Sequence, residues 1–150
     1  MIPITDQVED AATHLAIQDG AVVVFIPHTT AAVTVNESAD PMVAHDVLSI
    51  LDRVIPFHDS TYRHIEANSA PHIKSILVGT SETVIMRKGR LHLGTWQGLF
   101  CANSMAPGAG RCTWATSVVA IRQAPRTLSY IKRKEVNRMA KEIEIQYCTS

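Results

Sequence analysis

The sequence predicts one α+β domain. Its length of 150 residues fits a single domain that buries about two thirds of its unfolded surface. Apolar runs rich in β-branched residues, typical of buried strands, occur between segments whose apolar residues follow a helical period. The connections are short and there is no internal repeat, so this mixture favours an α+β arrangement over a doubly wound sheet.

The first predicted elements are a helix and two strands. Apolar residues recur with a helical period over Thr5–Ile17, with Thr5 or Asp6 as the N-cap, and Gly20 ends the segment. The β-branched run that follows lies between a glycine and a proline, which predicts a buried strand. The two predicted strands are Ala21–Ile26 and Ala31–Val35.

Two further helices follow. Asp40 is the expected N-cap of the first, Pro41 suits its first helical position, and Pro56 stops it. The second covers Pro71–Val78. We expect the apolar side chains of both helices to face the core: Val43, Val47, Ile50, Leu51 and Val54 in the first, and Ile73, Ile76 and Leu77 in the second.

The last pair of predicted strands is Ser81–Met86 and Arg90–Phe100, joined by a turn at Lys88-Gly89. In the second of these strands Leu91, Leu93 and Trp96 predict an inward-facing pattern. Beyond Phe100 the sequence turns into small residues without a period of either two or 3.6. From Leu128 it is dense in charge and predicts a solvated terminal helix or disorder.

The composition indicates which partners to expect. Fourteen basic and fourteen acidic side chains cancel, so no net field attracts nucleic acid or an anionic membrane. No apolar run approaches about 18 residues and no leader-like segment is visible, so we expect neither a membrane protein nor a secreted one. The three cysteines show no C-x-x-C spacing and favour a reducing cytoplasm: Cys101, Cys112 and Cys148.

Three histidines fall at the ends of predicted elements and carry the main functional hypothesis. His28, His64 and His72 each lie beside other polar side chains. Imidazoles that converge with a carboxylate can bind a divalent metal or transfer protons near neutral pH. Lys74, near a helix start, could hold a phosphate. No H-x-x-x-H or H-E-x-x-H pair is present, so any single histidine is more simply explained as a surface or capping residue.

Other polar residues have two interpretations each. Asn36 and Glu37 follow a strand and precede a helix cap, so they are either site residues or turn formers. Trp96 and Gln97 lie between two glycines. Packing in the core would explain Trp96, but a buried Gln97 would then need hydrogen-bond partners.

Read together, four stretches resemble the YjbQ-like family, also called secondary thiamine-phosphate synthase enzymes, over residues 4–100. They are "PHTTAAVTVNESADP", "HD" at 45–46, "YRHIEANSAPHIKSILVGTS" and "GRLHLGTWQGLF". The resemblance implies an α+β protein with a β-sandwich and two or three helices, assembled as a homotrimer. It also implies a weak or secondary transferase activity that joins the pyrimidine and thiazole halves of thiamine phosphate and releases pyrophosphate.

The resemblance also implies roles for individual residues. A metal or proton-transfer cluster would contain His28, His64, Glu66 and His72, with zinc or magnesium on the three histidines. Substrate contacts, including a phosphate on Lys74 and a wall at Gln97, would come from Asn36, Glu37, Asn68, Lys74, Trp96 and Gln97. The alternative from another class is a trimeric module that binds a metal or an anion without turnover.

The chain departs from the family pattern in three places. Ala67 stands where the family usually has glycine, which matters only if that backbone needs a positive φ. The family opens with a strand before the equivalent of Ile4, so a first strand is expected to be missing. After Phe100 the family continues as Cys-Glu-Phe-Asp-Gly-Pro-Arg and a closing strand, which this sequence lacks.

A shift of reading frame accounts for the third departure. Codons for residues 101–108, read from the third base of the cysteine codon, can spell Cys-Glu-Phe-Asp-Gly-Pro-Arg. We therefore predict that one base is missing near codons 100–101. On this hypothesis residues 1–100 form the family domain, and residues 101–150 are an atypical, out-of-frame segment that packs poorly and leaves sheet edges exposed.

Overall fold

The computed structural model of the chain describes residues 1–103, 116–122 and 140–145. Its helices are α1 (Thr5–His14), α2 (Pro41–Val54) and α3 (Ser69–Val78). Its strands are β1 (Ile2–Pro3), β2 (Gly20–Phe25), β3 (Ala31–Glu37), β4 (Ser81–Arg87), β5 (Arg90–Leu91), β6 (Gln97–Asn103), β7 (Thr116–Arg122) and β8 (Ala140–Ile145). None of the helices in these ranges has the length and apolar character needed to cross a membrane.

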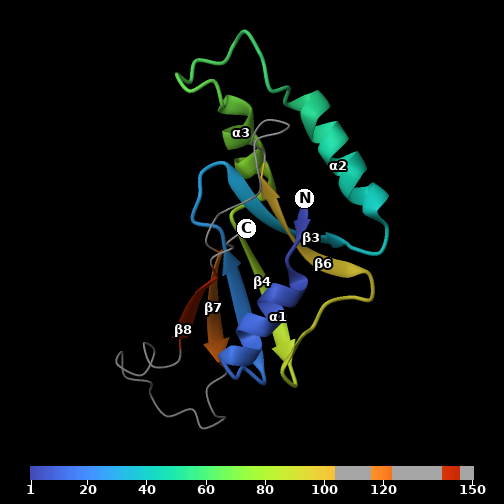
Figure 1. The fold of residues 1–150 in the computed structure, drawn as a ribbon, viewed down its shortest axis with the longest axis vertical. Helices are drawn as coiled ribbons and strands as arrows, with labels where there is room; N and C mark the ends of the chain where they lie inside the picture. The colour runs from blue at the N-terminus through green and yellow to red at the C-terminus, as the bar shows by residue number, and fades with distance from the viewer. Residues whose placement is uncertain (104–115, 123–139, 146–150) are drawn as a thin grey trace, which may run out of the picture.

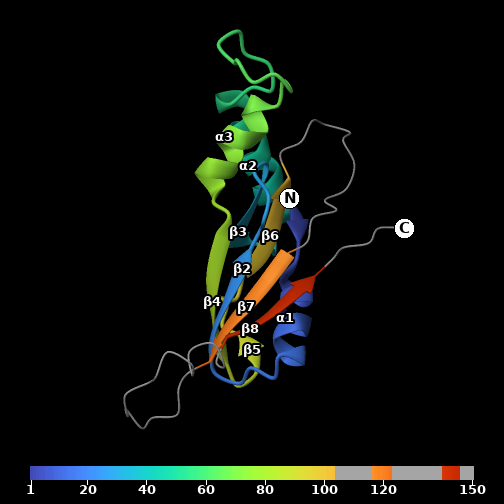
Figure 2. The same ribbon diagram turned by 90° about the vertical axis from the view of Figure 1, so that its left-hand side faces the viewer.

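Two antiparallel sheets form the body of the molecule (Figures 1 and 2). One has the strand order β1-β6-β3 and the other the order β5-β4-β2-β7-β8. Side chains from both sheets and from α1 meet in one core, including Val8, Val24, Val33 and Leu99. This sharing of one core by two sheets and a helix confirms the predicted α+β fold.

Helices α2 and α3 lie together at one end of the molecule, while α1 lies along the strands in the other half (Figure 1). As predicted, Asp40 caps α2, because its side chain accepts the N–H of Met42, and Pro41 occupies the first turn. The predicted turn at Lys88-Gly89 is also confirmed. Both residues have positive φ, of 51° and 76°, and they join β4 to β5 as a two-residue hairpin.

The prediction for α1 was wrong at both ends. Its N-cap is Ile4, because the Thr5 hydroxyl accepts the N–H of Leu99 in β6 at 2.9 Å and does not cap the helix. The helix ends at His14, since the chain then turns through Ala16, which has a φ of 53°. A contact with a distant strand therefore replaced the local cap.

The predicted strand Arg90–Phe100 is interrupted. β5 ends at Leu91 and β6 begins at Gln97, because a turn intervenes in which Gly94 N–H donates to Gln97 Oε1 at 2.8 Å. This turn leaves the Trp96 side chain 66% exposed, so the prediction that it faces inward was wrong. The Trp96 carbonyl instead accepts the N–H of Ser38 at 2.7 Å and ties the turn to the start of α2.

The apolar faces predicted for α2 and α3 are not in the core. No residue of α2 is buried, and Val54 is 67% exposed. In α3 the buried residues are Ala70, Pro71, Lys74 and Ser75, whereas Ile76 is 80% exposed. The reason is that α3 docks on the first residue of β3 through its polar edge, where Ser75 Oγ donates to the Ala31 carbonyl at 2.9 Å.

The sheet continues past Phe100. Ala102 and Asn103 pair with Ala32 and Ala31, so the prediction that residues 101–150 pack poorly was wrong for these two residues. β7 pairs with β2, and β8 pairs with β7, so residues 140–145 form a strand where a helical or disordered tail was predicted. Residues 104–112 lie outside the described ranges. The frame shift remains a prediction, which re-sequencing codons 95–115 tests.

Candidate functional site

The structure brings two of the three predicted histidines into contact. His64 lies in the loop after α2, and His72 lies in the first half of α3. Their ring centroids are 5.1 Å apart and their planes are inclined by 50°. His64 is exposed and His72 is half-buried, so both imidazoles can meet a ligand from solvent. The predicted proximity of the two side chains is confirmed.

A short turn holds Glu66 and Asn68 beside the histidine pair. The N–H of Ala67 donates to the His64 carbonyl at 3.1 Å and closes the turn. Asn68 then precedes α3 without capping it through its side chain, and its Nδ2 donates to Glu66 Oε2 at 3.2 Å. Within the described residues, Asn68 Oδ1 is buried and has no hydrogen-bond partner. Asn68 lines neither of the hollows described next, so its role as a substrate contact remains a prediction.

Two hollows meet at His64. One, of about 350 Å³, also has His72, Ser69, Ile73 and residues 61–63 in its wall. The other, of about 320 Å³, is lined by residues 57–60, Tyr62 and Ala67. Asp59 in this second wall accepts hydrogen bonds from the hydroxyl and the N–H of Thr61, which hold the pKa of Asp59 below its usual value.

His28, the third predicted member, lies in the loop between β2 and β3. Its Nδ1 accepts the N–H of Thr30 at 3.2 Å and lies 3.1 Å from the Thr30 hydroxyl. Hydrogen bonds hold both ends of this loop. At its start the N–H of Ile26 donates to the carbonyl of Thr80, just after α3, and at its end the Ser75 hydroxyl of α3 donates to the carbonyl of Ala31. Within the described residues no group of three or more side chains suited to a metal is present. The zinc or magnesium site remains a prediction.

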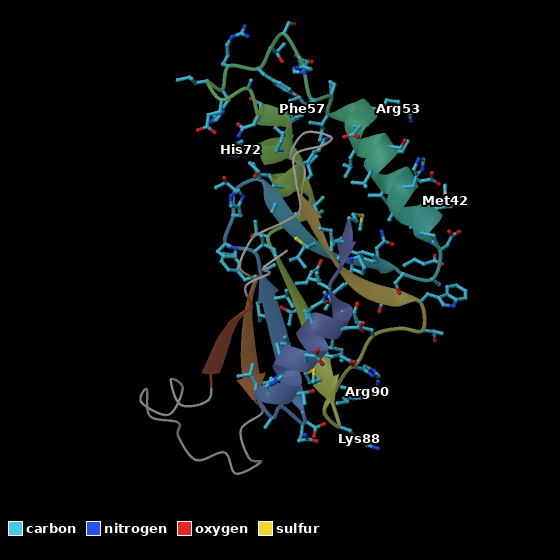
Figure 3. The ribbon with its side chains drawn as sticks, viewed as in Figure 1. Met42, Arg53, Phe57, His72, Lys88 and Arg90 are labelled. Carbon is cyan, nitrogen blue, oxygen red and sulfur yellow. The ribbon has the colours of Figure 1, made fainter. Side chains whose placement is uncertain are left out.

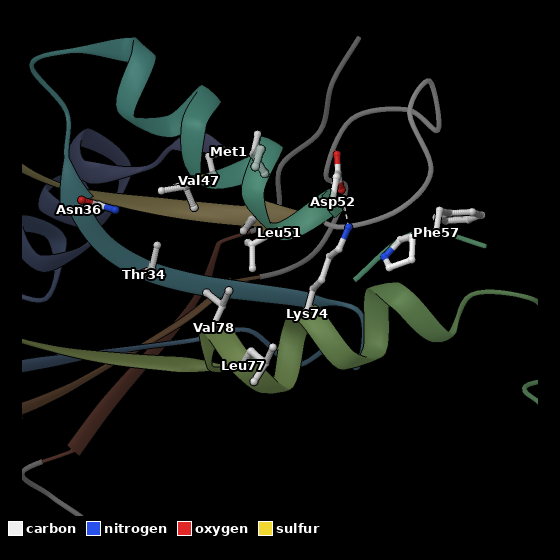
Figure 4. A pocket seen from close by; sticks show the side chains of 13 residues that line it. Met1, Thr34, Asn36, Val47, Leu51, Asp52, Phe57, Lys74, Leu77 and Val78 are labelled. Carbon is white, nitrogen blue, oxygen red and sulfur yellow. Dashed lines mark hydrogen bonds and ion pairs between the residues drawn. The ribbon is translucent and has the colours of Figure 1, made fainter. Parts of the chain in front are cut away.

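Lys74 and Asn36 line a different cavity, between α2, α3 and β3 (Figure 4). Its volume is about 620 Å³. The Lys74 side chain is only 6% exposed and forms an ion pair with Asp52 of α2, whose side chain is 69% exposed. Sequence reasoning missed Asp52, because it lies 22 residues before Lys74 and belongs to no motif.

The remaining predicted contacts are in the β3–β6 ladder. Glu37 is paired with Gln97, and Asn36 Oδ1 accepts the N–H of Glu37 at 2.8 Å. Neither Glu37, Trp96 nor Gln97 lines the two hollows at His64. Their roles as substrate contacts remain predictions.

We expect Ala67→Gly to stabilise the protein. Ala67 has a φ of 54°, the left-handed region in which a Cβ is unfavourable and glycine is not. Relief of this strain should exceed the extra chain entropy and raise the free energy of unfolding by up to about 1 kcal/mol, measured by urea denaturation. Ala44→Gly, inside α2, should lower it by about 1 kcal/mol. A loss of stability in Ala67→Gly would show that no strain is stored there.

The two sheets and the three described helices define a class: an α+β sandwich protein in which His64 and His72 lie in contact at one end of the body. The family model described as UPF0047 protein YjbQ-like matches residues 1–118. This match extends past residue 100, where the resemblance was expected to end. The chain belongs to the YjbQ-like UPF0047 family.

Relatives and solved structures agree with this assignment. The UPF0047 protein YugU of Bacillus subtilis is 45% identical over 112 residues, which cover 75% of this chain and 85% of that protein. A UPF0047 protein of Methanocaldococcus jannaschii is 44% identical over 107 residues, which cover 71% of this chain and 77% of that protein. A crystal structure of a family member from Clostridium acetobutylicum is 48% identical, with a TM-score of 0.65. The match covers 67% of this chain and 77% of that chain. The crystal structure of a hypothetical protein from Aeropyrum pernix is 27% identical, with a TM-score of 0.70. The match covers 81% of this chain and 88% of that chain.

Proposed function

We propose that the protein is a thiamine-phosphate-synthase-like transferase whose reaction centre contains His64 and His72. The observation that carries this proposal is the contact of two solvent-accessible imidazoles, whose ring centroids are 5.1 Å apart and which both line one hollow. Imidazole changes its charge near neutral pH, so this pair is suited to proton transfer in either direction. Glu66, which lies in the same turn as His64, adds an exposed carboxylate that accepts a hydrogen bond from Asn68.

The reaction needs little covalent chemistry from the protein. The thiazole nitrogen attacks the methylene carbon of the pyrimidine diphosphate, a C–N bond forms, and the C–O bond breaks with its electron pair leaving on the diphosphate. An imidazolium of the pair donates a proton to that departing group. The start of α3 supports an anion nearby, because Asn68 leaves its first N–H groups without a side-chain acceptor.

We also propose that the protein acts as a homotrimer. Large apolar side chains on α2 and α3 are exposed in the single chain outside the cavity between the two helices, among them Ile50, Val54 and Ile76. Exposed apolar patches of this kind mark interfaces in soluble proteins. The alternative function, a trimeric module that binds a metal or anion at the histidines without turnover, uses the same surface and side chains.

Incubation of the purified protein with the phosphorylated pyrimidine and thiazole precursors tests the transferase directly. We expect thiamine phosphate and pyrophosphate in equal amounts, measured by chromatography. Light scattering of the same preparation should give the mass of a trimer. Absence of product, combined with metal binding that His72→Ala abolishes, would exclude the transferase and favour the binding module.

A further inference from the structure

The cavity between α2 and α3 has the size and lining of a binding site separate from the histidine pair. Its volume of about 620 Å³ lies within the usual range for small-molecule sites. Most of its walls are apolar: Val47, Leu48 and Leu51 of α2, and Leu77 and Val78 of α3. The floor is β3, which contributes Thr34 and Asn36 (Figure 4).

One full charge is buried in this wall. The Lys74 side chain extends from α3 across the end of the cavity and is 6% exposed (Figure 4). Burial of an ammonium group is unfavourable unless acceptors replace its lost water. Lys74 has three N–H donors, and within the described residues Asp52 is its hydrogen-bond partner. The ammonium group therefore has donors left for a ligand.

Asp52 occupies the solvent side of this ion pair. Its side chain is 69% exposed, so its carboxylate can turn into water at little cost. Lys74 cannot leave in the same way, because its stem is enclosed by α3 and the cavity wall. An anion that enters the cavity can thus replace Asp52 as the partner of Lys74.

We propose that this cavity binds a small organic anion, with an apolar, preferably aromatic, body between α2 and α3 and a carboxylate, sulfonate or phosphate group on Lys74. The apolar body matches Leu51, Leu77 and Val78, and the anionic group matches the buried ammonium. A second copy of the chain packed into the cavity would bury the apolar walls but would not need the charge of Lys74. Dependence on that charge therefore distinguishes the two occupants.

Titration of the full chain with anilinonaphthalene sulfonate, a fluorescent apolar anion, tests this site. We expect saturable binding that Lys74→Met weakens about tenfold or more, since a hydrogen bond to a charged group contributes on that order. The matched control is Lys88→Met, at the opposite end of the molecule (Figure 3), which should bind like the wild type. Equal binding by Lys74→Met and wild type, or no binding at all, would overturn the assignment.

Asp52→Asn provides a variant that keeps the buried lysine. Removal of the competing carboxylate should tighten probe binding by about two- to fivefold. Weaker or unchanged probe binding by Asp52→Asn would contradict the proposed exchange of partners at Lys74. This variant decides the question even where Lys74→Met does not fold. His72→Ala should bind the probe normally, because His72 is not in the cavity wall, so this site and the transferase can fail independently.

Competition identifies the chemistry of the natural ligand. Phenyl phosphate or benzoate should displace the probe, and their relative strengths tell a phosphate from a carboxylate ligand. Inorganic phosphate or benzyl alcohol at the same concentration should not, because each lacks one of the two required parts. Two outcomes would refute a site for an apolar anion. One is that inorganic phosphate by itself displaces the probe, and the other is that neither phenyl phosphate nor benzoate displaces it.

Discussion

Replacing His72 by alanine is expected to lower the rate of thiamine phosphate formation by about 100-fold or more, the usual contribution of a general acid–base group. His72 is half-buried in α3, and its ring contacts that of His64, which is exposed in the preceding loop. Loss of the His72 ring removes both its own proton and the contact that orients His64. The effect should appear in kcat, because the proton is transferred in the reaction step.

The control is His14→Ala, in the last turn of α1 in the other half of the molecule (Figure 1), which should leave the rate unchanged. Added imidazole should restore part of the activity of His72→Ala, whereas a merely structural role would show no rescue. His64→Ala combined with His72→Ala should cost little more than His72→Ala alone, because the two groups act as one unit. Full activity in His72→Ala would remove the histidine pair from the mechanism.

We expect Leu99→Ala to lower the free energy of unfolding by about 3–5 kcal/mol, a large part of the roughly 5–15 kcal/mol typical of a domain. Leu99 is fully buried in the core that both sheets share. Its carbonyl accepts the N–H of Ile4 at 2.8 Å and its N–H donates to the Thr5 hydroxyl at 2.9 Å, so the backbone is tied to α1 on both sides. These bonds limit the collapse of the strand around a cavity.

Urea denaturation followed by circular dichroism measures this loss. The matched control is Ile85→Ala in β4, where the side chain is 51% exposed and the loss should stay below about 1 kcal/mol. Similar losses in the two variants would mean that Leu99 is not at the centre of the core. A lowered denaturant slope would instead indicate that the substitution changes cooperativity.

Local signals predicted those parts of the fold that a few neighbouring residues decide. Asp40 and Pro41 determine the start of α2, because a cap and a restricted φ act within one turn. The turn at Lys88-Gly89 follows from the tolerance of glycine for positive φ. The β-branched run at Ala21–Ile26 predicted the strand that is found at Gly20–Phe25, since such side chains suit a pleated, half-buried surface.

The candidate site was predictable only in part. The sequence placed His64 and His72 at the ends of elements, and they do lie together, because the loop between them leads directly into α3. It could not indicate that Lys74 belongs to a separate cavity, since its partner Asp52 comes from another helix. Side-chain partners across elements depend on how helices are set on the sheet, which periodicity does not specify.

By itself, the sequence determined the α+β class, most of the elements and the polar loop that carries His64 and leads into the helix of His72, because these depend on residues close together in the chain. Only the tertiary structure decided which surfaces meet. Ser75 bonds to Ala31 and turns Ile76 outward, the turn at Gly94 exposes Trp96, and Thr5 bonds to Leu99 instead of capping its own helix. In each case a hydrogen bond to a backbone group, which cannot be left unpaired at low cost, prevailed over the local apolar or capping preference.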